Sequence, residues 1–190
     1  MARFLIGWEL GASPDLLLDA ADLAYGLVAR GHDVRLAVAD PVALATVFDL
    51  RLAGSILPAP VPPLRPDLVM KPPKEGGIGD KLAVQGFASP AVLSGLALAW
   101  RNLLQAIEPA AVVALGAPVL ALAARGRVGL LVAGSVDALP PGEVGGLPRI
   151  HANMAPAVPE RQMLENANLV LERLGGAPLA TPGALLLGDH

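Results

Sequence analysis

The sequence predicts an α/β fold built on a parallel sheet, and three observations support this prediction. Short apolar runs, suited to buried strands, alternate along the chain with longer segments of helical spacing. Glycine or proline stands at most of the boundaries between these segments. The first two strands and the helix between them form a β-α-β unit, which almost always crosses over right-handed and makes its strands parallel.

The first of these units occupies the N-terminal end of the chain. Residues 3–8 are an apolar run of strand length, and residues 15–30 have helical spacing that stops at Gly31. Residues 33–39 then alternate between apolar and polar side chains, which is typical of a strand. A proline begins the next helical segment, which we expect over residues 41–49.

The middle of the chain contains a proline-rich segment followed by two helical patterns. A short third strand is expected near residues 56–57, and the prolines of residues 58–73 favour an ordered surface loop over a helix or central strand. Helical spacing resumes over residues 80–87 and again over residues 90–107. Ser89 is placed to cap the second of these, the longest predicted helix, with proline at its first position.

Two further apolar runs complete the predicted sheet. Residues 110–115 and 128–133 suit buried parallel strands, and a helix over residues 118–125 separates them. The last predicted helix covers residues 159–174 and ends at a pair of glycines. No repeat of fixed period is present, so a single domain over residues 1–190 is expected.

Composition and charge narrow the classes of function. The chain has 190 residues, of which 54% are hydrophobic and only 16% charged, so we expect some apolar surface to meet a partner. The net charge of -3 argues against binding to nucleic acid. The absence of cysteine removes disulfides, thiolate zinc sites and thiol nucleophiles. The three histidines lack the spacing of metal ligands, and we expect neither a metal site nor a cofactor.

The same composition bears on location. The apolar run before Glu9 is too short for the core of a signal peptide, so Met1 is expected to be a true start. Charged residues, glycine or proline interrupt every long apolar run, so no membrane span is predicted. A soluble, cytoplasmic protein is the expectation.

Three segments carry a resemblance to a known family. They are RFLIGWELG at residues 3–11, LVARGHDV at residues 27–34, and GFASP at residues 86–90 ahead of Trp100 and Arg101. Together they resemble the N-terminal domain of a GT-B glycosyltransferase-like protein, over nearly the whole chain. The resemblance implies a Rossmann-like three-layer domain, with strand order 3-2-1-4-5 and helices on both faces of the sheet. In that family the N-terminal domain holds a small-molecule acceptor and a second domain holds the nucleotide sugar, so the chain is expected to be one half, without the second domain.

The chain departs from the family at the expected site. Where relatives have a Gly-His pair after the first strand, this chain has Asp15 and Leu16, so the usual base is missing. The acidic residue and polar loop that often follow the fourth and fifth strands are also altered. Ligands of open α/β sheets bind outside the carboxyl ends of the strands, so these changes surround one crevice. The residues expected at this substrate-binding crevice are Trp8, Gly11, Ala12, Ser13, Leu115, Gly116, Gly134 and Ser135.

The first helix has an apolar face wider than one contact with a sheet requires. One stripe, predicted to face the core, contains Leu16, Ala20, Leu23 and Leu27. The residues that widen it, and form a candidate interface for self-association, are Leu17, Leu18, Tyr25 and Val28. A helix buried between sheet and loop is the alternative interpretation.

Candidate catalytic residues are few. Glu9 and Asp137 are candidates for a desolvated general base beside Trp8, if both point into the crevice; ordinary strand-end carboxylates are the favoured alternative. A hydrolase triad of Ser135, Asp137 and His151 is disfavoured because the GxSxG turn is absent.

Three hypotheses for function follow. The leading one is an acceptor-side domain that is not catalytically competent alone and is either natural or engineered. The alternatives are a redesigned or degenerate Rossmann-like scaffold that forms a homo-oligomer through its first helix, and an artificial pocket enzyme with a carboxylate base.

Overall fold

The structure is a computed structural model that describes residues 1–10, 14–49, 56–62, 77–134, 145–148 and 156–188. The strands are β1 (Arg3–Trp8), β2 (Asp33–Val38), β3 (Ile56–Pro58), β4 (Ala111–Leu115) and β5 (Gly129–Ala133). The helices are α1 (Pro14–Ala29), α2 (Pro41–Ala45), α3 (Ile78–Leu82), the π-helix η3 (Ala83–Phe87), α4 (Pro90–Ile107), α5 (Pro118–Ala124), α6 (Glu160–Arg173) and the 3₁₀-helix η4 (Pro182–Leu186).

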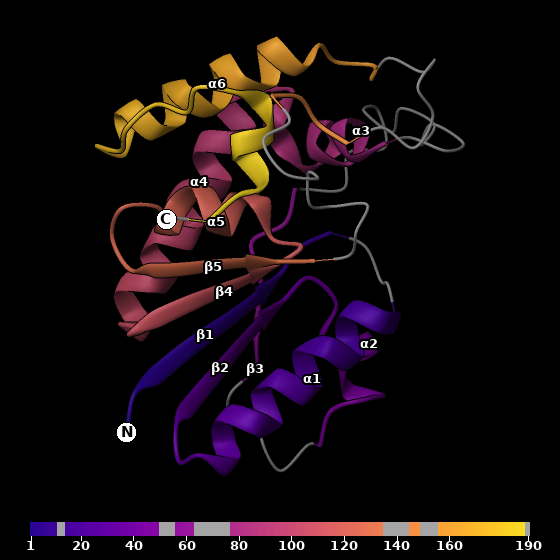
Figure 1. Ribbon diagram of the computed structural model, residues 1–190, viewed down its shortest axis with the longest axis vertical. Coiled ribbons are helices and arrows are strands. Elements are labelled where there is room, and N and C mark those ends of the chain that lie inside the picture. Colours follow the sequence, from indigo (N-terminus) through magenta and orange to yellow (C-terminus); the bar gives the residue numbers. More distant parts are fainter. Residues whose placement is uncertain (11–13, 50–55, 63–76, 135–144, 149–155, 189–190) are drawn as a thin grey trace.

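The five strands form a parallel sheet in the order β3-β2-β1-β4-β5 (Figure 1). This confirms the predicted α/β class and the strand order 3-2-1-4-5 that the resemblance implies. In such an order the chain leaves the centre in both directions, so β1 and β4 are neighbours although about a hundred residues separate them. The carboxyl ends of β1 and β4 therefore meet in the middle of one edge of the sheet, where ligands of doubly wound sheets bind.

One face of the sheet is covered by α1 and α2 (Figure 1). The buried side chains on this face are all hydrophobic among the described residues and include Trp8, Leu36 and Leu115 from the strands. The α1 helix contributes Leu16, Leu17, Ala20, Ala21 and Ala24 to this core. Leu23, which the helical spacing placed in the core stripe, is 36% exposed, because the buried stripe lies one position further round the helix.

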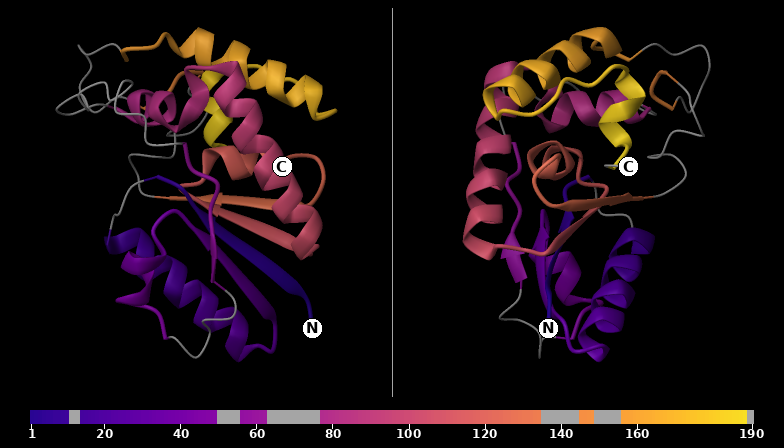
Figure 2. Two further views of the ribbon diagram at one scale, coloured as in Figure 1. Left: turned by 180° about the vertical axis from the view of Figure 1, so that it is seen from behind. Right: turned by 60° about the vertical axis from the view of Figure 1, so that its left-hand side comes forward.

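The opposite face is covered by α4 and α5, and α6 and η4 pack outside them (Figure 2). Every residue of α5 is buried, which accounts for its lack of charged or polar side chains. Trp100 of α4 is fully buried against this face. It comes close to β1 because Gly7 has no side chain there: a Cβ at Gly7 would lie 3.3 Å from the Trp100 ring and 2.1 Å from Cδ2 of Leu120.

The structure matches the predicted boundaries of β1 and α4 and alters several others. The helix expected over residues 41–49 ends at Ala45, and the one over residues 80–87 is a short α-helix followed by a π-helix. Within the π-helix the backbone is kinked at Gly86, whose φ of 109° is a conformation that favours glycine. Ser89 is the N-cap of α4, as expected from its position, but its side chain makes no capping hydrogen bond.

Among the helices of the described segments, no single one has the length and apolarity to cross a bilayer. Residues 78–87 and 90–107 form a bent pair, with an angle of 78° between its parts, that together has sufficient length and apolarity. Trp100 and the other core-facing side chains of this pair are buried in the fold.

Candidate functional site

The carboxyl end of β1 places two neighbouring side chains on opposite faces of the sheet. Trp8 packs on the α1 side, in the cluster that contains Leu16 and Leu115, and is 2% exposed. Glu9 points to the other side, where it meets the start of α5 and is 4% exposed. The two residues therefore do not point together into one crevice, since successive side chains of an extended strand alternate between its faces.

Both carboxylate oxygens of Glu9 accept hydrogen bonds from the first turn of α5. The backbone N–H of Val119 donates to Oε2 at 3.0 Å, and that of Leu120 donates to Oε1 at 2.7 Å. The first N–H groups of a helix have no partner within the helix. Ala117, at the N-cap position of α5, has no side chain that could accept these hydrogen bonds. Glu9, which directly follows β1, supplies the acceptors instead.

Two buried side chains complete the surroundings of Glu9. The indole of Trp100 and the amide of Gln85 face the carboxylate closely enough to lower its pKa. Gln85 is 7% exposed and Trp100 is fully buried, yet by strict geometry neither Gln85 Nε2 nor Trp100 Nε1 has a hydrogen-bond partner in the described part of the chain. Four N–H donors therefore face the Glu9 carboxylate, and two of them, from Val119 and Leu120, make well-formed hydrogen bonds to it.

Burial decides the protonation of this carboxylate. Loss of water around the charged form raises the pKa of Glu9 from 4.5 to about 8, against the opposing effect of the backbone and side-chain donors. Glu9 is thus a desolvated carboxylate, and its desolvation comes from the α4 and α5 side and not from Trp8.

The turn after β4 connects the ends of three strands. The carbonyl of Gly116 accepts hydrogen bonds from the N–H of Glu9 at 3.3 Å and of Leu10 at 2.9 Å, and the Gly116 N–H donates to the Ala133 carbonyl at 2.9 Å. Gly116 has a φ of 57°, which a residue with a side chain rarely adopts. A glycine here lets the chain turn sharply from β4 into α5.

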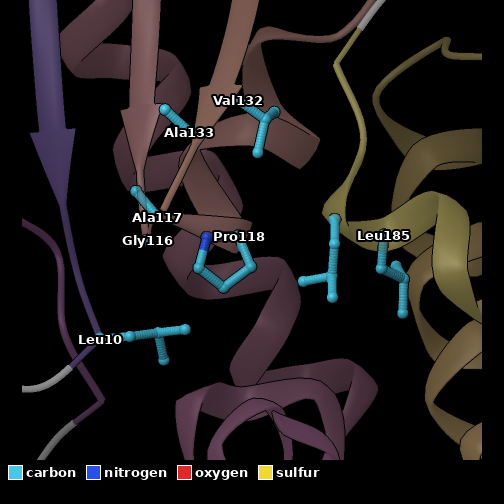
Figure 3. A pocket seen from close by; sticks show the side chains of 8 residues that line it. Leu10, Gly116, Ala117, Pro118, Val132, Ala133 and Leu185 are labelled. Carbon is cyan, nitrogen blue, oxygen red and sulfur yellow. The ribbon is translucent and has the colours of Figure 1, made fainter. Parts of the chain in front are cut away.

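A small apolar pocket lies at the carboxyl ends of β4 and β5 (Figure 3). Its walls come from the end of β1, the turn after β4, the end of β5 and η4. The lining residues are Leu10, Gly116, Ala117, Pro118, Val132, Ala133, Leu185 and Leu186. None of these carries a polar side chain, so this part of the crevice suits an uncharged, apolar group.

The structure places only some of the residues expected at the crevice. Gly116 lines the pocket, and Gly134 follows the end of β5 with partial exposure. Trp8 and Leu115 are buried in the α1-side core, at 2% and 4% exposure. The remaining candidates lie outside the described residues, namely Gly11, Ala12, Ser13, Ser135, Asp137 and His151.

Some residues of the candidate interface on α1 are buried and others are exposed. Leu17 is 6% exposed and Val28 packs partly against the α1-side core. Leu18 is 50% exposed and Tyr25 is 38% exposed. The ring of Tyr25 stacks on Phe48 at 5.2 Å, and its hydroxyl accepts a hydrogen bond from the Asp49 N–H, so it holds the chain after α2 against α1.

Sequence reasoning missed the partners of Glu9. Gln85 and Trp100 are separated from it by more than seventy residues, and only the tertiary fold brings them together. The alternation along β1 was an available signal, because it assigns residues 6 and 8 to one face and residues 5, 7 and 9 to the other. The contribution of Leu185 and Leu186 had no clear sequence signal, since η4 was not predicted.

Among the described residues, no group of three or more histidine, aspartate or glutamate side chains is placed to hold a metal ion. His32 packs edge-on against Phe4 at 5.0 Å, and its Nδ1 accepts a hydrogen bond from the Ala2 N–H.

Comparison with known proteins gives matches at the level of structure. No family model matches the sequence, and no curated protein matches it. Among solved structures, the chain is similar to the glycosyltransferase SnogD from Streptomyces nogalater, with 21% identity and a TM-score of 0.52 over 94% of this chain. It is also similar to SsfS6, a glycosyltransferase of Streptomyces sp. SF2575, with 14% identity and a TM-score of 0.53 over 96% of this chain. The fold is that of part of a GT-B glycosyltransferase.

The spinosyn rhamnosyltransferase SpnG shows the same likeness in two complexes. The complex with thymidine diphosphate gives 18% identity and a TM-score of 0.53, and the complex with spinosyn aglycone gives 17% and 0.50, each over 96% of this chain. The chain spans 44% of SnogD, 49% of SsfS6 and 43% of SpnG. It therefore corresponds to somewhat less than half of each of these proteins, and identities this low establish similarity of fold.

Proposed function

We propose that this chain is the acceptor-side, N-terminal domain of a glycosyltransferase-like protein and binds a small-molecule acceptor at the carboxyl ends of β1, β4 and β5. The observation that carries the proposal is the structural match, which covers nearly all of this chain and less than half of three glycosyltransferases. The position of the apolar pocket supports it, because ligands of doubly wound sheets bind at this edge.

The chemistry of the pocket favours an apolar acceptor group. Leu10, Val132, Leu185 and Leu186 present hydrocarbon, and Pro118 closes the side towards α5 (Figure 3). A charged or strongly polar group would lose its hydration here without gaining a hydrogen bond from the lining side chains. An aglycone that presents an apolar group here meets this requirement.

The chain alone is not expected to transfer a sugar. By analogy with the two-domain arrangement of the family, the nucleotide sugar would be held by a second domain. Glu9 is unsuited to the role of base, because a base must reach the proton it removes, and this carboxylate is 4% exposed with both oxygens bonded to α5. We therefore assign it a structural role beneath the crevice, where it joins the end of β1 to the first turn of α5. A cytoplasmic location is part of the same proposal.

Acceptor binding is tested by nuclear magnetic resonance on the ¹⁵N-labelled chain. Spinosyn aglycone and a panel of other hydroxylated, largely apolar compounds are added in turn, and thymidine diphosphate is added separately. We expect at least one aglycone to shift the backbone amide signals of Ala117, Val132 and Ala133, with weak affinity. Thymidine diphosphate should leave these signals unchanged, and a coupled assay with nucleotide sugars should show no transfer.

Two matched variants decide whether the pocket is responsible. Ala133→Phe fills the pocket at the carboxyl end of β5 and should abolish the shifts. Ala110→Phe adds the same ring at an exposed position just before β4, at the opposite end of that strand, and should leave them intact. Aglycone binding that survives Ala133→Phe, or sugar transfer by the isolated chain, would contradict the proposal.

A second candidate function is self-association through α1, favoured by the exposed Leu18. Light scattering across a concentration series should then show an oligomer that Leu18→Glu dissociates. Leu169→Glu makes the same exchange on α6, at a side chain 43% exposed, and serves as the control. A monomer at all concentrations would eliminate this candidate.

A further inference from the structure

The surroundings of Glu9 contain more hydrogen-bonding capacity than a structural contact requires. The carboxylate accepts two backbone N–H bonds, and two further buried donors, Gln85 Nε2 and Trp100 Nε1, face it without partners among the described residues. Unsatisfied buried polar atoms are rare in folded proteins because each one costs free energy. Both face the same carboxylate, so the charge on Glu9 decides how strongly each of them is held there.

The group has only two chemical states, and its neighbours respond to them differently. When Glu9 is ionised, all four neighbouring N–H groups can act as donors to it. When it takes up a proton from solvent, the new O–H is a donor and requires an acceptor. The indole N–H of Trp100 and the backbone N–H groups of Val119 and Leu120 cannot accept a hydrogen bond. Gln85 can, because turning its amide presents the carbonyl oxygen instead of the NH₂ group.

The residues bonded to Glu9 are directly connected to the pocket. Leu10 follows Glu9 in the chain, and Ala117 and Pro118 precede Val119, so three lining residues neighbour the bonded atoms. A change in the hydrogen bonds of Glu9 would therefore displace the floor of the pocket. We propose that Glu9, Gln85 and Trp100 form a proton-operated latch that joins β1 to the first turn of α5 and alters the pocket floor when Glu9 gains or loses its proton.

No other described titratable group competes with Glu9 in this role. The elements α5, η3 and β4 carry none, and β1 carries only Arg3, which is ion-paired with Asp33 at 2.7 Å. On α4 the sole titratable side chain is Arg101, which donates to the Leu174 carbonyl at 3.2 Å. On α3, the Asp80 carboxylate accepts from the Ala157 N–H at 2.9 Å, and Lys81 is exposed. Because burial raises the pKa of Glu9, this side chain gains or loses its proton near neutral pH.

The latch is tested without any ligand, so its outcome is separate from that of the proposed function. The side-chain ¹³Cδ signal of Glu9 and the ¹⁵N signals of Trp100 Nε1 and Gln85 Nε2 are followed from pH 5 to pH 9.5 in the unmodified chain. We expect a common midpoint near 8, where an ordinary glutamate titrates near 4.5. The backbone amides of Ala117, Val119 and Leu120 should shift with the same midpoint.

Two variants supply the controls. Glu9→Gln removes the titrating group and should abolish all of these shifts between pH 6 and pH 9.5. Glu172→Gln removes an exposed carboxylate from α6 and should leave them unchanged. A Glu9 signal that titrates below pH 5.5, or one that titrates near 8 while the amides of the pocket floor remain still, would overturn the proposal. The titration of the unmodified chain decides the matter even if Glu9→Gln does not fold.

Discussion

The two faces of the sheet are built on different principles. On the α1 side the buried side chains of the described residues are all hydrophobic, and Trp8 has its indole N–H satisfied by the carbonyl of Leu10 at 3.2 Å. On the α4 side the core also encloses a carboxylate and an amide, and the indole N–H of Trp100 has no partner in the described part of the chain. Among the described residues, the α1-side core therefore contains no buried titratable side chain, whereas the α4-side core contains Glu9. The difference predicts how each will respond to mutation and to pH.

The largest expected effect comes from removing the two buried indoles in turn. Trp100→Ala and Trp8→Ala should each lower the free energy of unfolding by about 3–5 kcal/mol, because each removes a large buried ring. Only Trp100→Ala opens space beside Glu9, which water can enter, so only this variant should bring the Glu9 pKa back towards 4.5. Urea unfolding at pH 6 and pH 9 measures the free energy of unfolding, and its change between the two pH values reports the shift in the Glu9 pKa.

A surface substitution on the same helix checks that the loss comes from the core. Leu98→Ala on α4, at a side chain 55% exposed, should change the free energy of unfolding by less than about 0.5 kcal/mol. Equal pH dependence in the Trp100→Ala and Trp8→Ala variants would show that the two faces do not differ in the way described.

A smaller effect is expected at Gly7, where α4 and α5 approach β1. The added methyl of Gly7→Ala would meet Leu120 and Trp100, so this variant should lose about 1–3 kcal/mol of stability through overpacking. Gly129→Ala adds the same methyl on β5, where its nearest neighbour would be 3.8 Å away, and should be neutral or slightly stabilising. Thermal unfolding of both variants gives the comparison, and equal melting temperatures would contradict it.

A dependence of stability on pH is also expected, and here Glu9 and Asp33 should act with opposite sign. Burial raises the pKa of Glu9 above its unfolded value, so the folded state binds more protons and stability falls as pH rises from about 4.5 through about 8. Arg3, aided by Arg35, lowers the pKa of Asp33, so its contribution is present above its ordinary pKa and is lost as pH falls through the folded pKa.

Because Asp33 is only partly buried and its partner Arg3 is 40% exposed, solvent screens the pair, and its contribution should be under about 1 kcal/mol. Asp33→Asn should therefore lose little at pH 7 and nothing further in acid, whereas Glu9→Gln should flatten the decline of stability above pH 6. Unfolding free energies measured from pH 3 to pH 9 separate the two contributions. A wild-type stability that rises between pH 6 and pH 9 would be inconsistent with the assignment for Glu9.

The parts of the fold that were predicted from sequence are those with local signals. The bounds of β1 and α4 follow from an apolar run and from Pro90 after an N-cap position, and both agree with the structure. The π-helix at residues 83–87 depends on how the chain packs against α4 and α6, so helical spacing alone did not reveal it. The resemblance supplied the strand order, which spacing could not.

The candidate site was harder to predict because its properties are tertiary. Glu9 was identified as a carboxylate at a strand end, but its protonation depends on Gln85, Trp100 and the backbone of α5. The apolar pocket likewise requires η4 to fold back beside β5, a contact between residues separated by more than fifty positions. Sequence patterns describe neighbours along the chain, and these contacts are not of that kind.

The complete burial of α5 has a consequence for how the protein is made. This helix lacks charged and polar side chains, and part of its cover comes from α6 and η4, which are synthesised later. During translation, α5 and the adjoining sheet are therefore complete while their apolar outer surface is still open to water or to a chaperone. Release of a nascent chain before η4 has emerged should leave a product that is prone to aggregation.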